Sequence, residues 1–181
     1  IQEAKSEIIN FGRFADGYNV TEAKLGETFS QWLDGKAVFI FQTKQWSIWD
    51  GSVWSEDECS LMNRLAYQFI SEAKEALFSS GKHSAAGNLS SFESLNRLEN
   101  LCKLAATDRA VSLRKFDVDA MLLTAPNQWI DLKSGATYDP DPSILVSKLI
   151  AIDFCSRSEC PNFEAFVNSI FEGDQDLISY V

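Results

Sequence analysis

The sequence has little of the chemistry that defines common enzyme classes. Histidine occurs once, as His83, and the 181 residues contain neither a Gly-x-x-x-x-Gly-Lys-Ser/Thr phosphate loop nor a Gly-x-Gly-x-x-Gly fingerprint. We therefore expect this chain to hydrolyse no nucleotide by itself. We also expect no catalytic role for His83, because a mobile polar loop is a poor place to fix a general base within hydrogen-bond reach of a substrate.

Positive charge is also scarce. The chain has 16 lysines and arginines against 26 aspartates and glutamates, a formal net charge of −10. Non-specific attraction to a phosphate backbone or an anionic membrane is therefore a poor default, and any contact with nucleic acid should be local. No run approaches the roughly 20 apolar residues that cross a bilayer, and a signal-peptide pattern is missing, so we expect a cytoplasmic protein without a membrane partner.

Cysteine is sparse and irregularly spaced. Cys59, Cys102, Cys155 and Cys160 lack the paired short spacings of a zinc site. We therefore expect buried, reduced thiols and no metal site. The chain begins without methionine and ends at Val181 without a helix stop signal, so we expect a fragment of a longer protein.

The composition, 45% hydrophobic with 12% aromatic residues, can build a sizeable core. The apolar spacing predicts an α+β fold, predominantly helical with a small antiparallel sheet. We expect a lead-in helix or linker over residues 1–20 and one domain over residues 21–181. Capping residues and apolar periodicity predict helices over 2–14, 21–34 (capped by Thr21), 143–150, 161–171 and 174–181, and two more after the capping boxes Ser55–Glu58 and Ser90–Glu93.

Short runs rich in β-branched and aromatic residues predict the strands. Residues 37–42 and 46–54 form a meander, in which a two-residue turn at Asp50-Gly51 places Ile48 opposite Val53 and Trp49 beside Trp54. The segment that runs through residues 122–123, 129–132 and the turn at residues 133–135 predicts a second pair of short strands joined by a glycine-containing turn. Residues 79–88 are expected to form a flexible loop and residues 139–142 an extended break.

Two carboxylates in Asp117-Val118-Asp119 suggest one enzymatic alternative. On a strand they would point to the same side and could share a divalent metal with Asp131, as in a primase or nuclease. The other interpretation, which we favour, is that Asp119 caps the turn at residues 120–123.

One segment departs from the acidic average. Residues 97–115 carry five basic and two acidic side chains, 5 − 2 = +3. Such a strip could orient a DNA strand, or it could be a solvated helix surface. The candidate nucleic-acid-binding residues are Arg97, Lys103, Arg109, Arg114 and Lys115. Three tryptophans, at positions 46, 49 and 54, could stack on bases, but we favour packing in the core.

Several short motifs follow one another along the chain. They are Thr21-Glu22-Ala23, Gly26-Glu27-Thr28-Phe29, Trp49-Asp50-Gly51-x-x-Trp54, Phe116-Asp117-x-Asp119, Leu122-Leu123, Pro126-Asn127, Ile130-Asp131-Leu132-x-x-Gly135, Asp139-Pro140, Cys160-Pro161-x-Phe163 and Gly173-Asp174. Their order resembles the N-terminal domain of phage, plasmid and poxvirus-type primase-helicases over about residues 21–181. One departure is the pair Asn127-Gln128, where the family usually has Asn-Gly.

The resemblance implies a non-catalytic accessory domain that lies directly before a superfamily 3 helicase core. It implies that the parent protein is a hexameric DNA helicase-primase of phage or prophage replication, whose core binds ATP and Mg²⁺ and hydrolyses ATP. The domain would help assemble the ring, couple to the motor or guide DNA, and it would hold no cofactor itself. The family pattern transfers no catalytic residue to this chain. The alternatives are a metal-dependent primase or nuclease domain that uses Asp117 and Asp119, and a pure protein-interaction domain with an acidic face.

Overall fold

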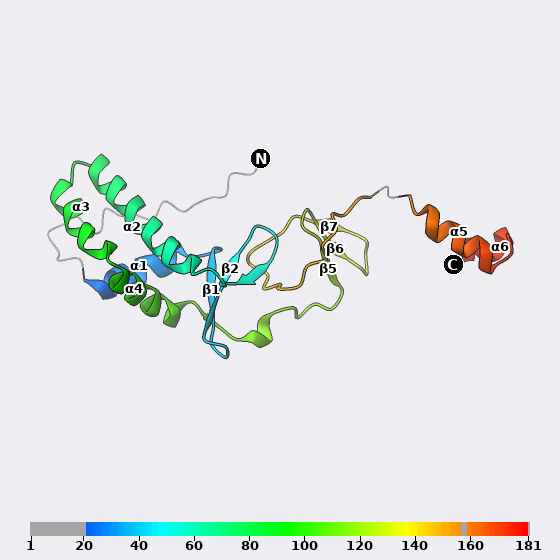
Figure 1. Cartoon of the computed structure of the whole chain (residues 1–181), viewed down its shortest axis with the longest axis horizontal. Helices are drawn as coiled ribbons and strands as arrows, with labels where there is room; N and C mark the ends of the chain where they lie inside the picture. The colour runs from blue at the N-terminus through cyan, green and yellow to red at the C-terminus, as the bar shows by residue number, and fades with distance from the viewer. Residues whose placement is uncertain (1–20, 157–158, 181) are drawn as a thin grey trace.

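The computed structural model describes residues 21–156 and 159–180. The helix predicted over residues 2–14 lies outside this range. Figure 1 shows a helical body, a first sheet beside it, a second sheet beyond, and a C-terminal helix pair at the far end. The predicted α+β class, dominated by helices, is confirmed. Within the described residues, no helix is long and apolar enough to cross a membrane.

Four helices form the body: α1 (Glu22–Trp32), α2 (Leu61–Ser79), α3 (His83–Leu89) and α4 (Leu95–Asp108). Their apolar faces meet in one core, because each helix places apolar residues at helical spacing on one side. Its largest fully buried members are Leu25, Phe29, Leu33, Phe69, Ile70, Leu77 and Leu89.

Helix α1 begins and ends as its sequence predicts. The Thr21 hydroxyl accepts a hydrogen bond from the Lys24 amide at 3.4 Å, and Gly35 follows the helix with φ of +67°. Gly26 lies where α1 crosses α4, and a Cβ added there would stand 2.8 Å from Cβ of Leu104. The two helices therefore approach closely at a position that only glycine fits.

The first predicted capping box is wrong. Ser55 and Glu56 belong to strand β3 (Trp54–Glu56), which pairs with β2 (Gln45–Trp49), so Ser55 cannot cap a helix. Helix α2 starts later, and the Asp57 carboxylate accepts hydrogen bonds from the amides of Leu61 and Met62 at 2.7 and 2.9 Å.

The second capping box and the predicted loop are also wrong. Residues Ser90–Glu93 form a 3₁₀-helix, η2, and α4 begins only at Leu95. The segment expected to be a flexible loop contains α3, because Ala86 and Leu89 are buried in the core and tertiary packing outweighs the poor helix propensity of glycine and serine.

The first sheet has the order β3-β2-β1-β4. Strands β1 (Ala37–Ile40), β2 and β3 form the predicted antiparallel meander. Strand β4 (Ala110–Val111) adds parallel to β1, a pairing that was not predicted from the sequence. One face of β1 and β2 packs on the helical core through Ala37, Trp46 and Ile48, so the helices cover one side of the sheet.

The β2–β3 register differs from the prediction. Trp49 lies beside Trp54, as expected, with ring centroids 5.6 Å apart, but Ile48 lies opposite Ser55 and not opposite Val53. The Asp50 carboxylate explains the difference, because it accepts hydrogen bonds from the amides of Ser52 and Val53 at 2.8 and 2.9 Å. These bonds stabilise a loop of residues 50–53 instead of a two-residue turn.

The second sheet has the order β5-β6-β7, all antiparallel: β5 (Leu122–Thr124), β6 (Trp129–Asp131) and β7 (Thr137–Tyr138). The predicted pair of strands is confirmed as β5 and β6, but residues 125–128 join them, and the glycine turn at residues 133–135 instead connects β6 to the additional strand β7. Trp129 joins the two sheets, because its ring packs on Trp49 and its indole N–H donates to the Ser52 carbonyl at 3.2 Å.

The helix predicted over residues 143–150 is absent, since this segment pairs with the sheets. The Val146 carbonyl accepts from the Trp54 amide at 2.8 Å, and the Lys148 carbonyl accepts from the Thr124 hydroxyl. Residues 139–142 lie outside every helix and strand, as predicted. Helices α5 (Pro161–Ile170) and α6 (Gln175–Tyr180) are confirmed.

Candidate nucleic-acid interface

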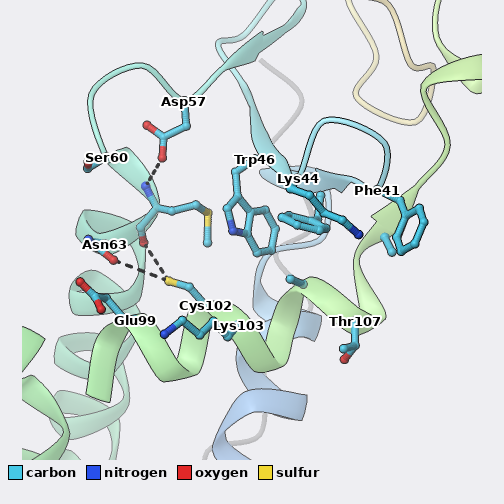
Figure 2. Close-up of a pocket in the computed structure, with 14 residues that line it drawn as sticks. Phe41, Lys44, Trp46, Asp57, Ser60, Asn63, Glu99, Cys102, Lys103 and Thr107 are labelled. Atoms are coloured by element: carbon cyan, nitrogen blue, oxygen red, sulfur yellow. Dashed lines mark hydrogen bonds between the residues drawn. The ribbon is translucent and has the colours of Figure 1, made fainter. Parts of the chain in front are cut away.

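A cavity of about 770 Å³ opens between the β1–β2 hairpin, the start of α2 and the outer face of α4 (Figure 2). Its volume lies within the roughly 300–1,000 Å³ of small-molecule sites. Three aromatic rings, Phe39, Phe41 and Trp46, line the hairpin side, and Lys44 and Lys103 contribute cationic groups. The cavity combines the groups that contact a base and a phosphate.

The hairpin holds its aromatic rings at defined angles. Phe39 and Trp46 meet edge to face, with centroids 5.4 Å apart, and Trp46 is half-buried. Phe41 is 59% exposed at the end of the hairpin, and the Lys44 ammonium lies 3.5 Å from its ring centroid. The hairpin therefore presents an aromatic surface with an attached positive charge.

The loop that carries Phe41 and Lys44 is anchored from outside the hairpin. The Gln42 side chain donates to the Ser112 hydroxyl at 2.9 Å and accepts from the Leu113 amide at 3.0 Å. Lys44 itself adopts φ of +60°, a region that few residues other than glycine and asparagine enter. The position of the exposed ring is therefore fixed by contacts with the chain that follows α4.

The α4 side of the cavity has a buried thiol. Cys102 donates to the Met62 carbonyl at 3.7 Å and to Oδ1 of Asn63 at 3.9 Å. Burial, with added repulsion from the charges of Asp57 and Glu99, raises the pKa of the Cys102 thiol to about 12. The thiol stays protonated and unreactive at neutral pH.

The two acids of the cavity differ in how far their charges are compensated. Both oxygens of Asp57 accept amide hydrogen bonds at the N-terminus of α2, where the helix dipole offsets a negative charge. Glu99 lies one helical turn before Lys103, and no ion pair joins them within the described residues. The lysine ammonium is thus available to a ligand.

The predicted basic strip does not form one continuous surface. At about 3.6 residues per turn, Arg97 and Lys103 point roughly 120° apart around α4. Arg97 contacts the Ser91 hydroxyl at 2.7 Å, and Glu22 lies 3.9 Å away. Arg109 pairs with Asp34 at 2.8 Å. Arg97 and Arg109 therefore have partners within the domain.

Arg114 and Lys115 lie together on the 3₁₀-helix η3 (Leu113–Lys115), directly after the segment that anchors the hairpin. Both are exposed. Lys115 also lines a second cavity, of about 620 Å³, together with Asp117, Asp119 and Lys148. Of the five predicted residues, Lys103, Arg114 and Lys115 leave their charges most accessible to DNA.

Each of the three carboxylates of the alternative metal site accepts hydrogen bonds from other groups of the protein. Asp117 accepts from the Ser147 amide and hydroxyl at 2.8 and 2.7 Å, and Asp119 accepts from the Met121 amide at 2.9 Å, as the capping interpretation predicts. Asp131 accepts from the Lys133 amide, which with the Ser134 hydroxyl lowers its pKa. Among the residues that the structure describes, no group of three potential ligands could hold a metal ion.

The remaining candidate residues are the histidine, the tryptophans and the cysteines. His83 opens α3, with its ring 4.5 Å from that of Phe78. Trp49 and Trp54 pack inside the fold, as predicted, whereas Trp46 lines the cavity. The expectation of buried thiols is wrong for Cys59, Cys155 and Cys160, which are exposed because they lie in loops and at a helix start.

Three residues of the cavity, Phe41, Lys44 and Asn63, were not predicted from the sequence, and they lie 34 to 56 residues before Arg97, where the basic strip begins. One signal was present. Phe41 lies near the end of the apolar run of residues 37–42, and a phenylalanine so close to a hairpin turn is unusual, because small polar residues prevail there. Nothing in the sequence indicates that α4 packs beside this hairpin.

A family model described as "D5 N terminal like" matches residues 26–172 of the chain. No curated protein matches the chain.

Proposed function

The chain belongs to the D5 N-terminal-like family, the N-terminal domain of phage and poxvirus primase-helicases, and we propose that it serves there as a non-catalytic accessory domain that guides DNA toward the motor. The observation that carries this proposal is the family match, which spans most of the described body, both sheets and α5. The match places the chain in the context of DNA replication.

The wider setting belongs to the same proposal. A superfamily 3 helicase core would follow this domain, bind ATP and Mg²⁺, and form a hexameric ring. The domain would add contacts at the entrance of that ring. It requires no cofactor for this role, because guiding a strand needs charge and shape and no bond breaking.

The charge distribution supports guidance by a local contact. The net charge of −10 makes non-specific attraction to DNA a poor default, so any contact should be local. Arg114 and Lys115 are exposed on η3, at the junction between the helical body and the second sheet. A strand attracted there would be held along one path and repelled from the neighbouring acidic surface.

The test is the salt dependence of single-stranded DNA binding by the 181-residue chain. Changing Arg114→Ala together with Lys115→Ala should weaken binding and make the slope of log affinity against log salt shallower by about 0.7 for each phosphate that the variant no longer neutralises. Lys133→Ala is the matched control, since Lys133 is exposed on the β6–β7 turn outside the strip. Equal slopes for the double variant and the control would contradict DNA guidance through η3.

A further inference from the structure

We propose that the cavity between the β1–β2 hairpin, α2 and α4 binds one unpaired nucleotide of single-stranded DNA. The inference deepens the proposed function and rests on it, because it adds a second, base-contacting site to the strand path. It is carried by an aromatic surface, two lysines and unused polar groups that three separate elements bring to one hollow (Figure 2).

The aromatic side chains form a surface that suits a base. Trp46 stands at the centre of the cavity in Figure 2, with Phe41 and Lys44 on one side and Asp57, Asn63 and Glu99 on the other. Its ring meets that of Phe39, which also lines the cavity, edge to face. Bases of every kind stack on such rings, so a site of this sort binds a strand without reading its sequence.

The cations are placed for the two phosphates that flank the base. Lys44 comes from the hairpin and Lys103 from α4, and both line the cavity. Lys44 contacts the Phe41 ring, so the exposed ring and the charge would reach one nucleotide together. Lys103 has no ion-pair partner in the part of the chain that the structure describes.

Polar groups deeper in the cavity remain available to a base edge. Asn63 uses its Oδ1 to accept the Cys102 thiol, which leaves its amide donors for a ligand, and the Glu99 carboxylate can accept from an exocyclic amine. No hydrogen bond of the Trp46 indole N–H is present among the described residues. These donors and acceptors match the mixed edges of nucleobases.

The same features argue against an apolar side chain of a protein partner. An apolar side chain would contact the rings but offer no partner to the charges of Lys44, Lys103 and Glu99. Its binding would remove water from these charges without replacing it, which costs free energy. Asp57 faces the cavity too, but its charge is offset by the two α2 amides whose hydrogen bonds it accepts. A nucleotide satisfies both the rings and the lysines.

The first experiment measures binding of a fluorescein-labelled oligothymidylate of about ten nucleotides to the 181-residue chain by anisotropy. Phe41→Ala should weaken binding about tenfold, the order expected when one base can no longer stack. Phe163→Ala is the matched control, because Phe163 on α5 is equally exposed, at 59% for each residue, and lies outside the cavity. Equal affinities of the two variants, or no binding by the unchanged chain, would overturn the proposal.

The lysines are tested by the salt slope. Lys44→Asn keeps the positive φ that asparagine tolerates and removes the charge, and Lys103→Ala preserves the helix. Each should make the slope shallower by about 0.7, and Lys103→Arg should restore it. Unchanged slopes would show that no phosphate lies at these lysines and would overturn the proposed position.

The outcomes separate this proposal from the broader one. If Arg114→Ala with Lys115→Ala weakens DNA binding while the cavity variants do not, guidance through η3 stands and the nucleotide site is wrong. Photo-crosslinking with a bromodeoxyuridine oligonucleotide gives an independent readout. The proposal requires a crosslinked peptide that contains Phe41 or Trp46. Crosslinks confined to other peptides would contradict it.

Discussion

Substituting alanine for Gly26 should destabilise the domain, although alanine is the better helix former. The new Cβ would lie 2.8 Å from Cβ and 3.1 Å from Cδ1 of Leu104. Carbon atoms prefer separations of about 3.5–4.0 Å, and the Leu104 Cβ cannot rotate away because it is bonded to the α4 backbone. The helices must therefore separate where they pack.

The magnitude follows from two opposing contributions. Overpacking in a tight core costs about 1–3 kcal/mol, and replacing a helical glycine by alanine returns up to about 1 kcal/mol. Gly87 in α3 offers the control, because its added Cβ would meet no atom within 4 Å. Gly87→Ala should raise stability, and the difference between the two variants isolates the overlap, at about 1–3 kcal/mol.

Urea unfolding followed by circular dichroism measures both free energies, and equal slopes of the free energy against urea concentration would show that the unfolded states are comparable. The reasoning is refuted if Gly26→Ala is as stable as Gly87→Ala. That result would mean that α1 and α4 do not pack closely at Gly26.

Two further predictions concern titratable groups. Burial alone would raise the pKa of Asp50, but hydrogen bonds from Val53, Ser52 and Ser55 outweigh burial, so the pKa is lower in the folded protein than in the unfolded chain. The stability that Asp50 contributes is therefore fully present above its unfolded pKa, near 3.9, and is lost as the pH falls through its folded pKa. Asp50→Asn should lower the melting temperature at pH 7, and that deficit should shrink at about pH 2–3; a deficit independent of pH would contradict the assignment. Cys102, with its pKa raised to about 12, should resist alkylation by iodoacetamide at about pH 8 while the exposed Cys59 reacts, as peptide mass spectrometry can show; equal rates would mean that Cys102 is accessible.

Local signals predicted the parts of the fold that depend on neighbouring residues. Thr21 caps α1 and Pro161 opens α5, because each acts within one turn of its own helix. The β1–β2–β3 meander followed from short apolar runs on either side of Asp50-Gly51, although these two residues belong to a longer loop. The resemblance to primase-helicase N-terminal domains likewise rested on residues in chain order, and the family match confirms it.

Errors arose where side-chain hydrogen bonds or strand pairing decide the local structure. The Asp50 carboxylate changed the hairpin loop, and with it the partner of Ile48. Pairing of Ser55 in β3 left helix capping to Asp57. Residues 143–150 carry helix-compatible spacing but hydrogen-bond to both sheets, a competition that periodicity cannot reveal.

The candidate site was accessible to sequence reasoning only in part. Lys103, Arg114 and Lys115 were identified from local charge, while Arg97 and Arg109 have acidic neighbours from other elements. Phe41, Lys44 and Asn63 join the site through the packing of α4 and α2 against the hairpin. Such a juxtaposition depends on tertiary contacts that no short sequence pattern encodes.

The most direct test of DNA guidance is the ratio of strand unwinding to ATP hydrolysis in a longer protein that contains both this domain and the proposed motor. With Arg114→Ala and Lys115→Ala, unwinding should fall while hydrolysis continues, because the motor is intact and the strand is delivered poorly. An unchanged ratio, or ATP hydrolysis by the 181-residue chain alone, would contradict the proposed role.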